Sequence, residues 1–318
     1  MGIDVGGTRI KAAVCNSAGS IVRSMEIDTR AQEGFERVMG RVISVARDLI
    51  AKTRSAQAEV KALGVGVPGR IDPRAGICFF SPNLPTWEDV QVLEPLREEL
   101  GLPVWMENDA NCAGLAELRF GAAKDAQSMV MFTLGTGVGG AVAMNDRLLT
   151  GPRNVIGEIG HTVVDPDGPL CGCGAHGCLE AFCGAHGISD RAAQRLQRGE
   201  KSIILDLVDG ETRNITPHVV VRAAAQGDAV ATAVLEETGM YLGIAIVNAT
   251  VFVDPDVVVI GGRVALAGPV LFDAIRRTVR ARCRIAPFDV ERIVPAELGA
   301  DAGAVGAAAL ALDGLATL

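Results

Sequence analysis

Residues 157–180 constrain the fold more strongly than any other stretch of this 318-residue chain. They read GEIGHTVVDPDGPLCGCGAHGCLE and hold one histidine and three cysteines, namely His161, Cys171, Cys173 and Cys178. One imidazole nitrogen and three thiolates form a tetrahedral ligand set that Zn²⁺ prefers. The spacing therefore predicts a zinc loop, and the loop would hold Glu158 and Glu180 at its two ends.

Other interpretations of these cysteines are weaker. Cysteines that only fill a core do not gather beside a histidine in this way, and Cys171 and Cys173 are too close in sequence to form an unstrained disulfide. Nothing marks the chain as secreted. Cys183, His186 and His176 lie in or just after the loop, so they remain alternative metal ligands.

The composition narrows the class of protein. A net charge of −8 without a dense basic run argues against a nucleic-acid partner. The longest apolar region, 242–260, is interrupted by Asn248 and by Asp254, Pro255 and Asp256, so no membrane partner is expected. Met1 leads directly into an apolar strand pattern without a signal peptide. We therefore expect a cytoplasmic globular protein whose cysteines stay reduced.

Residues 3–14, IDVGGTRIKAAV, predict a strand, a glycine turn and a second strand. The backbone N–H groups of Gly6 and Gly7 and the hydroxyl of Thr8 can bind a phosphate group, while Asp4 is placed to hold Mg²⁺ through water. The first turn therefore predicts a phosphate and magnesium site.

Residues 132–143, FTLGTGVGGAVA, repeat this design. The repetition predicts a duplicated architecture in which Gly135, Thr136 and Gly137 form a second phosphate turn. Gly135, Gly137 and Gly140 also fit the dinucleotide pattern G-x-G-x-x-G, which leaves a zinc-containing dehydrogenase as an alternative. That pattern requires a following helix, whereas an Asn145-Asp146 turn after residue 144 predicts a hairpin instead.

Several polar residues follow predicted strands at their carboxyl ends, where open α/β folds bind ligands. Asn83 lies between two prolines, and Asn108 and Asp109 lie between a strand at 103–106 and a helix that runs to about residue 120. A plain helix cap is the alternative role for Asp109.

Apolar periodicity predicts further strands at 63–67 and 257–260, and helices at 35–53, 187–199, 217–226, 228–247, 269–283 and 301–312.

Seven short motifs now stand in order along the chain: DVGGT (4–8), GVGVPG (64–69), PNLPTW (82–87), ENDAN (107–111), LGTGVGG (134–140), GEIGH (157–161) and CGCGAHGCLE (171–180). Together they resemble the ROK family of sugar kinases and repressors, and within it the kinase branch close to bacterial glucokinases. The resemblance covers essentially the whole chain.

The resemblance implies an actin-like (ribonuclease H-like) fold of two α/β domains with a structural zinc loop and with ATP between the domains. The expected boundaries are 1–107 for the first domain, with a last helix at about 302–318 packing back on it, and 108–301 for the second, with the zinc loop at 161–178. The resemblance also implies a homodimer or homotetramer that binds a hexose, ATP, Mg²⁺ and a structural Zn²⁺.

The resemblance assigns roles to single residues. Asp109 would be the base that accepts the proton of the attacking sugar hydroxyl. The sugar would be bound by Gly69, Asn83, Asn108, Asp109, Glu158, His161 and Glu180. The nucleotide would be bound by Asp4, Gly6, Gly7, Thr8, Lys11, Gly135, Thr136, Gly137, Gly261 and Gly262. Zinc would be held by His161, Cys171, Cys173 and Cys178.

Three positions depart from the family pattern, the first being Cys183, which stands where a serine is common. Arg263 follows Gly261 and Gly262 where a third glycine is usual, which leaves the preferred phosphoryl donor open among ATP, GTP and polyphosphate. Arg9 stands where lysine is frequent, which we interpret as a neutral exchange of one basic residue for another.

The resemblance implies a hexose kinase that forms glucose 6-phosphate, with N-acetylmannosamine, N-acetylglucosamine and mannose as alternative substrates. A sugar-sensing repressor of the same family would carry a DNA-binding domain before the first strand, where only three residues precede Asp4. A glycosidase that uses Glu158 and Glu180 as its carboxylate pair would leave the phosphate turns unexplained.

Overall fold

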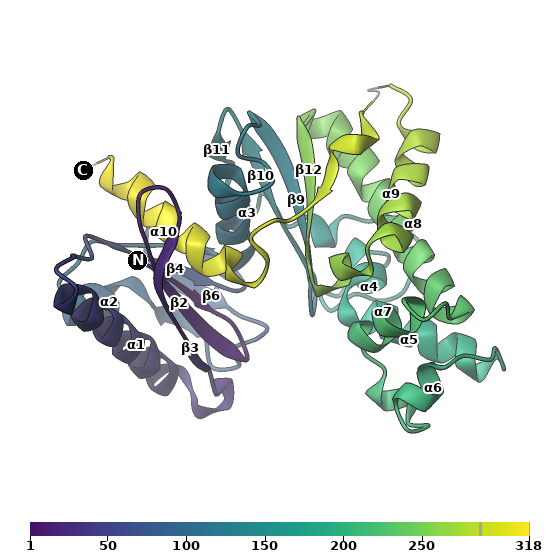
Figure 1. Cartoon of the computed structure of the whole chain (residues 1–318), viewed down its shortest axis with the longest axis horizontal. Coiled ribbons are helices and arrows are strands. Elements are labelled where there is room, and N and C mark those ends of the chain that lie inside the picture. Colours follow the sequence, from purple (N-terminus) through teal and green to yellow (C-terminus); the bar gives the residue numbers. More distant parts are fainter. Residues whose placement is uncertain (286–287, 318) are drawn as a thin grey trace.

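Two five-stranded sheets with two helices between them form the protein (Figure 1). The computed structural model describes residues 1–285 and 288–317. The first sheet has the order β3 (Ile21–Asp28), β2 (Arg9–Cys15), β1 (Gly2–Val5), β4 (Leu63–Val67) and β8 (Val104–Asn108). The second has the order β11 (Arg147–Leu148), β10 (Val138–Met144), β9 (Ser128–Leu134), β12 (Val257–Gly262) and β13 (Ile293–Pro295).

The two sheets repeat one topology. In each, two antiparallel pairings join the three strands that are consecutive in the chain, and two parallel pairings add the remaining two strands. The predicted duplication is confirmed by this repeat. A small third sheet of β5 (Arg70–Asp72), β6 (Ile77–Phe80) and β7 (Glu88–Gln91) extends the first half.

Alternation along the strands divides each sheet into two faces. On β9, Val130 and Phe132 belong to the larger core, while Met129 and Met131 belong to a separate cluster on the opposite face. The larger core is closed by helices of the second half: α4 (Leu179–Cys183), α5 (Ala185–Gln197), α6 (Ile204–Leu207), α7 (Pro217–Ala224), α8 (Ala229–Val253) and α9 (Pro269–Arg282). On the first sheet, α1 (Phe35–Ser55) and α2 (Leu93–Leu100) cover the outer face.

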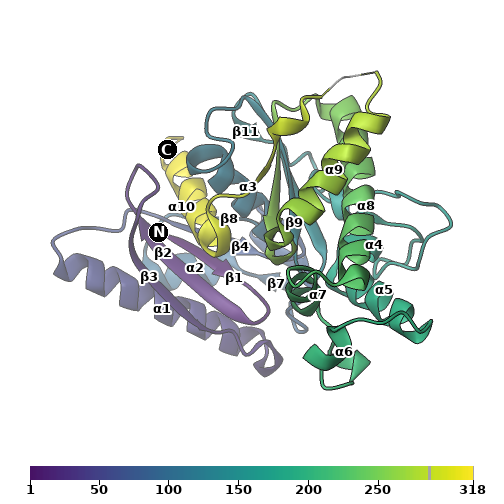
Figure 2. The same cartoon turned by 45° about the vertical axis from the view of Figure 1, so that its right-hand side comes forward.

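The layer between the sheets consists of α3 (Asp109–Phe120) and α10 (Ala302–Leu315) (Figure 2). The last helix packs on β1 and β4 of the first half. The domain boundaries at residues 107 and 301 remain a prediction, and residue 318 lies outside the described residues.

Most predicted elements are observed within a few residues of their expected ends. The main difference is α8, which continues to Val253 and ends where Asp254 adopts a left-handed backbone with φ of 50° just before Pro255. Among the described residues, α8 is also the one helix long and apolar enough by composition to cross a membrane, and 56% of its most apolar window is buried against the rest of the protein.

A buried carboxylate ties the layer between the sheets to the chain that enters α10. Glu117 of α3 is fully buried, and its oxygens accept hydrogen bonds from the backbone N–H groups of Ala122 (2.9 Å), Glu297 (3.1 Å) and Leu298 (2.8 Å). Three donors on one carboxylate satisfy a charge that burial would otherwise make costly.

We expect Glu117→Ala to lower the free energy of unfolding by about 3 kcal/mol, because it leaves buried N–H groups without an acceptor. Glu297→Ala is the matched control, since Glu297 is exposed and takes part in this contact only through its backbone N–H. Urea denaturation of both variants measures the difference, and equal stabilities would contradict the assigned role of Glu117.

Candidate functional site

The first glycine turn joins β1 to β2 as predicted, with Asp4 paired to Lys11 across the hairpin. A buried threonine fixes the turn from outside it: Thr29 donates its hydroxyl to the carbonyl oxygen of Gly6 (2.6 Å) and its N–H to that of Thr8 (2.9 Å). The carbonyl oxygens of Gly6 and Thr8 are thereby occupied. Lys11 reaches the carbonyl oxygen of Ala300 with its ammonium group (2.7 Å) and thus lies near the start of α10.

Asp109 begins α3, but it is not the helix cap. Asn108 is the cap, and its side-chain oxygen accepts from the N–H groups of Ala110 (2.9 Å) and Asn111 (3.3 Å). The Asp109 carboxylate accepts from the N–H of Ala110 (2.9 Å) and keeps much of its acceptor capacity. The alternative role of Asp109 as a plain cap is therefore wrong, and its carboxylate can accept a bond or a proton from a ligand.

Four carboxylates form a series in this part of the molecule, in which each one acts electrostatically on the next. Burial, reinforced by the charge of Asp109 and opposed by Lys11, raises the pKa of Asp4 to about 7. Burial also raises the pKa of Asp109, and Glu158 adds to this effect. For Glu158, burial and the neighbouring Glu180 raise the pKa, while His161 opposes the shift. The structure thus brings Asp4, Asp109, Glu158 and Glu180 within electrostatic reach of one another.

The predicted sugar-binding residues of the first half lie beside this acidic series. Gly69 has φ of 97°, and a Cβ there would come within 2.2 Å of the carbonyl oxygen of Phe80. Its own carbonyl oxygen accepts from the side-chain amide of Asn108 (3.2 Å). Asn83 packs against the first turn, because a Cβ on Gly7 would lie 2.8 Å from the Cβ of Asn83. Gly69, Asn83 and Asn108 are therefore brought together at the carboxyl ends of β1, β4 and β8.

The second glycine turn joins β9 to β10, so Gly140 lies on a strand and not before a helix. The dehydrogenase alternative is excluded by that geometry. Space is open around Gly135, where a Cβ would meet nothing within 4 Å, whereas a Cβ on Gly137 would lie 2.2 Å from the Oε2 atom of Glu180. That oxygen accepts from the N–H of Val138 (2.9 Å), so Glu180 is a structural contact of the turn.

The third glycine turn ends β12 at the same edge of the sheet. Gly262 pairs with Leu134 in register, has φ of 87°, and would carry a Cβ only 2.1 Å from the carbonyl oxygen of Leu134. Arg263 follows it at the start of a 3₁₀ helix and is exposed. The second and third turns are therefore neighbours, with Gly261 and Gly262 paired to Thr133 and Leu134, directly before Gly135.

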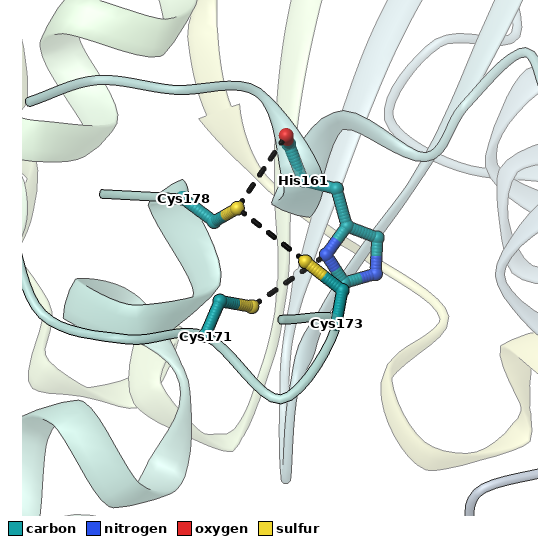
Figure 3. A group of neighbouring side chains, drawn as sticks. All are labelled: His161, Cys171, Cys173 and Cys178. Atoms are coloured by element: carbon teal, nitrogen blue, oxygen red, sulfur yellow. Dashed lines mark hydrogen bonds between the residues drawn. The ribbon is translucent and has the colours of Figure 1, made fainter. Parts of the chain in front are cut away.

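The predicted metal loop closes as a cluster (Figure 3). The Nδ1 atom of His161 and the Sγ atom of Cys171 are 3.7 Å apart, as are the Sγ atoms of Cys173 and Cys178, and the four ligand atoms all lie within 4.8 Å of one another. Tetrahedral Zn²⁺ with bonds of about 2.0–2.3 Å separates neighbouring ligand atoms by about 3.5–3.8 Å. The donor set and its spacing therefore fit a zinc ion with four protein ligands.

The other ring nitrogen of His161 points to the carboxylates. Its Nε2 atom lies 4.0 Å from Glu158 Oε2. The alternative metal ligands are engaged elsewhere or lie outside the cluster: Cys183 donates to the carbonyl oxygen of Thr238 (3.5 Å), and His176 is 3.1 Å from that of Gly168. Among the described residues, the cluster contains neither of them, nor His186.

Three polar residues of the site carried no recognisable sequence signal. Thr29 fixes the first turn, and Glu107 and Asn154 form a contact between the ENDAN segment and the chain that leads to Glu158. Glu107 lies within a quoted motif, but the motif does not reveal that its carboxylate is buried. The signal that could have directed attention to Asn154 is weak, because asparagine is common in turns.

The family model described as ROK family matches residues 1–314. The chain belongs to the ROK family. Among curated relatives, this ROK protein is 34% identical to a glucokinase of Thermotoga maritima, over 98% of this chain and 96% of the relative. It is 36% identical to a glucokinase of Halalkalibacterium halodurans, over 96% and 92% of the two chains.

Solved structures give the same picture of the fold. A ROK family glucokinase from Streptomyces griseus, in complex with glucose and AMPPNP, is 32% identical with a TM-score of 0.83, and the match covers 98% of each chain. A ROK hexokinase from Thermus thermophilus is 34% identical with a TM-score of 0.82, covering 100% of this chain and 99% of the other. The expected two-part actin-like sugar kinase fold is confirmed.

Repressors of the same family match less fully. A putative xylose repressor of Caldicellulosiruptor is 27% identical over 98% of this chain but over only 78% of its own length. The match thus covers 92–96% of the length of these glucokinases but 78% of the length of the repressor.

We expect Cys173→Ser to abolish stoichiometric zinc binding, because three remaining protein ligands close the site poorly. Atomic emission on the purified protein gives the zinc content, and the melting temperature reports the folding of the loop. Cys183→Ser is the matched control, since a hydroxyl there can still donate to Thr238. Zinc retained by Cys173→Ser, or lost equally by Cys183→Ser, would contradict the ligand set.

Proposed function

We propose that this protein is an ATP-dependent hexose kinase that transfers the γ-phosphoryl group of ATP to the 6-hydroxyl of glucose. The observation that carries the proposal is Asp109, whose half-buried carboxylate is relieved of helix capping by Asn108 and lies within reach of Asp4 and Glu158. The named glucokinase relatives, at 32–36% identity along nearly the whole chain, support the same activity.

In this proposal, Asp109 accepts the proton of the attacking hydroxyl as the bond from its oxygen to phosphorus forms. The burial that raises the pKa of Asp109 brings it closer to the working pH and makes the carboxylate a stronger base. The bond from the γ-phosphorus to the bridging oxygen breaks, and ADP leaves. Glucose 6-phosphate and ADP are the products, and the proton remains on Asp109 until it passes to water.

The sugar is held by residues that accept or orient hydroxyl groups. Asn83, Glu158 and the free Nε2 of His161 are placed for this role, as are the second amide hydrogen of Asn108 and the carbonyl oxygen of Gly69. Glu180 keeps acceptor capacity beyond its bond to Val138. A set of carboxylates and amides suits a polyhydroxylated ligand, because each O–H group must find an acceptor when it leaves water.

The nucleotide phosphates are bound by the two glycine turns. Gly7 and Thr8 present N–H and hydroxyl groups from one sheet, and Thr136 and Gly137 do so from the other, with Gly261 and Gly262 next to them. Gly6 and Gly135 shape the turns instead, because their N–H groups donate to the carbonyl oxygens of Arg9 and Gly137 (3.0 Å each). Asp4 would hold Mg²⁺, which neutralises the charge that develops on the phosphoryl oxygens. The acidic surroundings of Asp4 fit a cation, since its raised pKa comes from burial and from a neighbouring carboxylate.

Several finer assignments belong to the same proposal. The zinc ion is structural, because His161 and the three cysteines fill all four positions. The protein acts in the cytoplasm as a homodimer or homotetramer, and light scattering on the purified chain measures the oligomeric state directly.

The preferred sugar and the preferred phosphoryl donor are tested by coupled ADP release. The sugars compared are glucose, mannose, N-acetylglucosamine, N-acetylmannosamine and allose. The donors compared are ATP, GTP and polyphosphate, because Arg263 leaves the donor open.

We expect Asp109→Asn to lower kcat for glucose by about 10²–10⁴-fold while glucose still binds, because the amide cannot accept the proton. The coupled assay measures kcat, and isothermal titration calorimetry measures glucose binding. Asp125→Asn changes an exposed aspartate outside the site and should leave both unchanged. Near-normal turnover by Asp109→Asn would contradict the role of base.

We expect the acid limb of the pH profile of kcat/KM to lie above the ordinary aspartate range, because Asp109 works only when deprotonated and its pKa is raised. Glu158→Gln removes a neighbouring negative charge, so the pKa of Asp109 falls and the limb moves to lower pH. The position of the limb is the measurement, since its height also changes if Glu158 binds sugar. The exposed Glu36→Gln serves as control, and an unmoved limb in Glu158→Gln would contradict this coupling.

A further inference from the structure

A second buried carboxylate lies directly before the proposed base. Glu107 is the fourth residue of β8, is only 6% exposed, and accepts three hydrogen bonds on one oxygen. The donors are the backbone N–H of Asn108 (2.7 Å), the side-chain amide of Asn111 (3.1 Å) and the side-chain amide of Asn154 (3.0 Å). All three belong to neutral residues, so the negative charge is stabilised by oriented N–H groups rather than by a cation.

Two of the three donors lie beside Asp109 in the chain. Asn108 caps α3 and Asn111 follows two residues after Asp109, so Glu107 holds the first turn of the helix against the end of β8. The third donor comes from another part of the protein. Asn154 lies between β11 and Glu158, and its amide crosses to Glu107 from the opposite half of the chain.

The segment that carries Asn154 depends on few contacts of its own. Its backbone bonds are long, at 3.3 Å from Asn154 N–H to Gly151, 3.3 Å from Ile156 to Thr150, and 3.4 Å from Glu158 to Val155. Asn154 has φ of 52°, a left-handed conformation that asparagine tolerates. The bond to Glu107 therefore ties a loosely bonded segment to the rigid end of the first sheet, four residues before Glu158.

The amide orientations support one direction for these bonds. The side-chain oxygens of Asn111 and Asn154 are both buried without a hydrogen-bond partner, while both amide nitrogens face Glu107. A reversed amide would place its oxygen against the carboxylate and lose the bond. The two amide oxygens are left without hydrogen bonds, which costs free energy. We expect this cost where the contacts of the amide nitrogens to the Glu107 carboxylate determine the geometry.

We propose that Glu107, Asn111 and Asn154 form a clasp that fixes the position of Glu158 relative to Asp109 and so determines the affinity of the sugar site. The three residues of the Glu107 clasp are positioning residues and not catalytic ones, because they act through Glu158 and Asp109. The inference rests on the proposed function, because it takes Glu158 as a sugar ligand and Asp109 as the base.

The first test compares two asparagines with the same backbone. Asn154→Gly removes the amide but permits the left-handed conformation, and we expect the KM for glucose to rise about tenfold while kcat and the KM for ATP stay within about threefold. Asn145→Gly is the matched control, because Asn145 also has φ of 52° but lies in the exposed β10–β11 turn. A KM for glucose unchanged in Asn154→Gly would overturn the clasp.

The second test exchanges donor and acceptor across the contact. Asn154→Asp places a carboxylate against Glu107, and we expect the largest rise in the KM for glucose. The double variant Glu107→Gln/Asn154→Asp restores a donor opposite an acceptor and should recover most of that rise. If the KM for glucose of the double variant is no lower than that of Asn154→Asp, these residues only support folding and the clasp is overturned. The melting temperatures of all variants are measured alongside.

Calorimetric titration with glucose separates the clasp from the activity. An unaltered protein that binds glucose without phosphorylating any hexose overturns the proposed function, and the clasp is then judged by the glucose dissociation constants of the same variants. A protein that neither binds nor phosphorylates the screened hexoses overturns both.

Discussion

The whole arrangement depends on how closely two helices approach the sheets between which they lie. A Cβ on Gly2 of β1 would come within 2.0 Å of the carbonyl oxygen of Ala304, and one on Gly64 of β4 within 1.8 Å of that of Ala307. The two helices approach each other as closely, since a Cβ on Gly306 would lie 1.7 Å from the carbonyl oxygen of Cys112. Any side chain at these positions would force the layers apart, because backbone atoms cannot yield as a flexible side chain does.

This close packing determines where the acidic groups lie. Asp4 pairs in register with Gly66 of β4, and a Cβ built on Gly66 would lie 3.7 Å from the Cα of Asp109. Asp4 also lies against Gly303 of α10. The proposed base and the proposed magnesium ligand therefore lie on either side of Gly66, and α10 can lie against Asp4 because Gly303 has no side chain.

The electrostatic consequence of that packing is a site that is unfavourable without its ligands. Burial and mutual repulsion raise the pKa of Asp4, Asp109 and Glu158 in the protein alone. Burial, reinforced by the charges of Glu107, Asp4 and Asp109, also raises the pKa of the Cys112 thiol well above its usual range. A cation at Asp4 and hydroxyl donors at Asp109 and Glu158 would relieve this repulsion, so the arrangement of these carboxylates favours binding of such ligands.

The sequence predicted those features whose chemistry is local. A glycine turn between two alternating strands, or three cysteines near a histidine, carries its geometry within a few residues. It could not distinguish Asn108 from Asp109 as the helix cap, because both residue types cap equally well and the choice depends on where β8 ends. The sequence did not reveal the roles of Thr29, Glu107 and Glu117. Their hydrogen-bond partners are N–H or carbonyl groups at distant positions or on the backbone, and the residue types at those positions do not indicate such contacts.

Glu180 illustrates how the metal loop can influence more than the sugar pocket. One of its carboxylate oxygens accepts from Val138 in the second glycine turn, and the other lies 3.6 Å from the Sγ atom of Cys171. The same turn is held again where the N–H of Ala185 donates to the carbonyl oxygen of Thr136 (3.0 Å). The helix capped by Cys178 therefore supports the second glycine turn, which is the proposed phosphate turn. Because the metal ligands fix the start of that helix, an ordered loop is a condition for the geometry of both substrates, the sugar and the nucleotide.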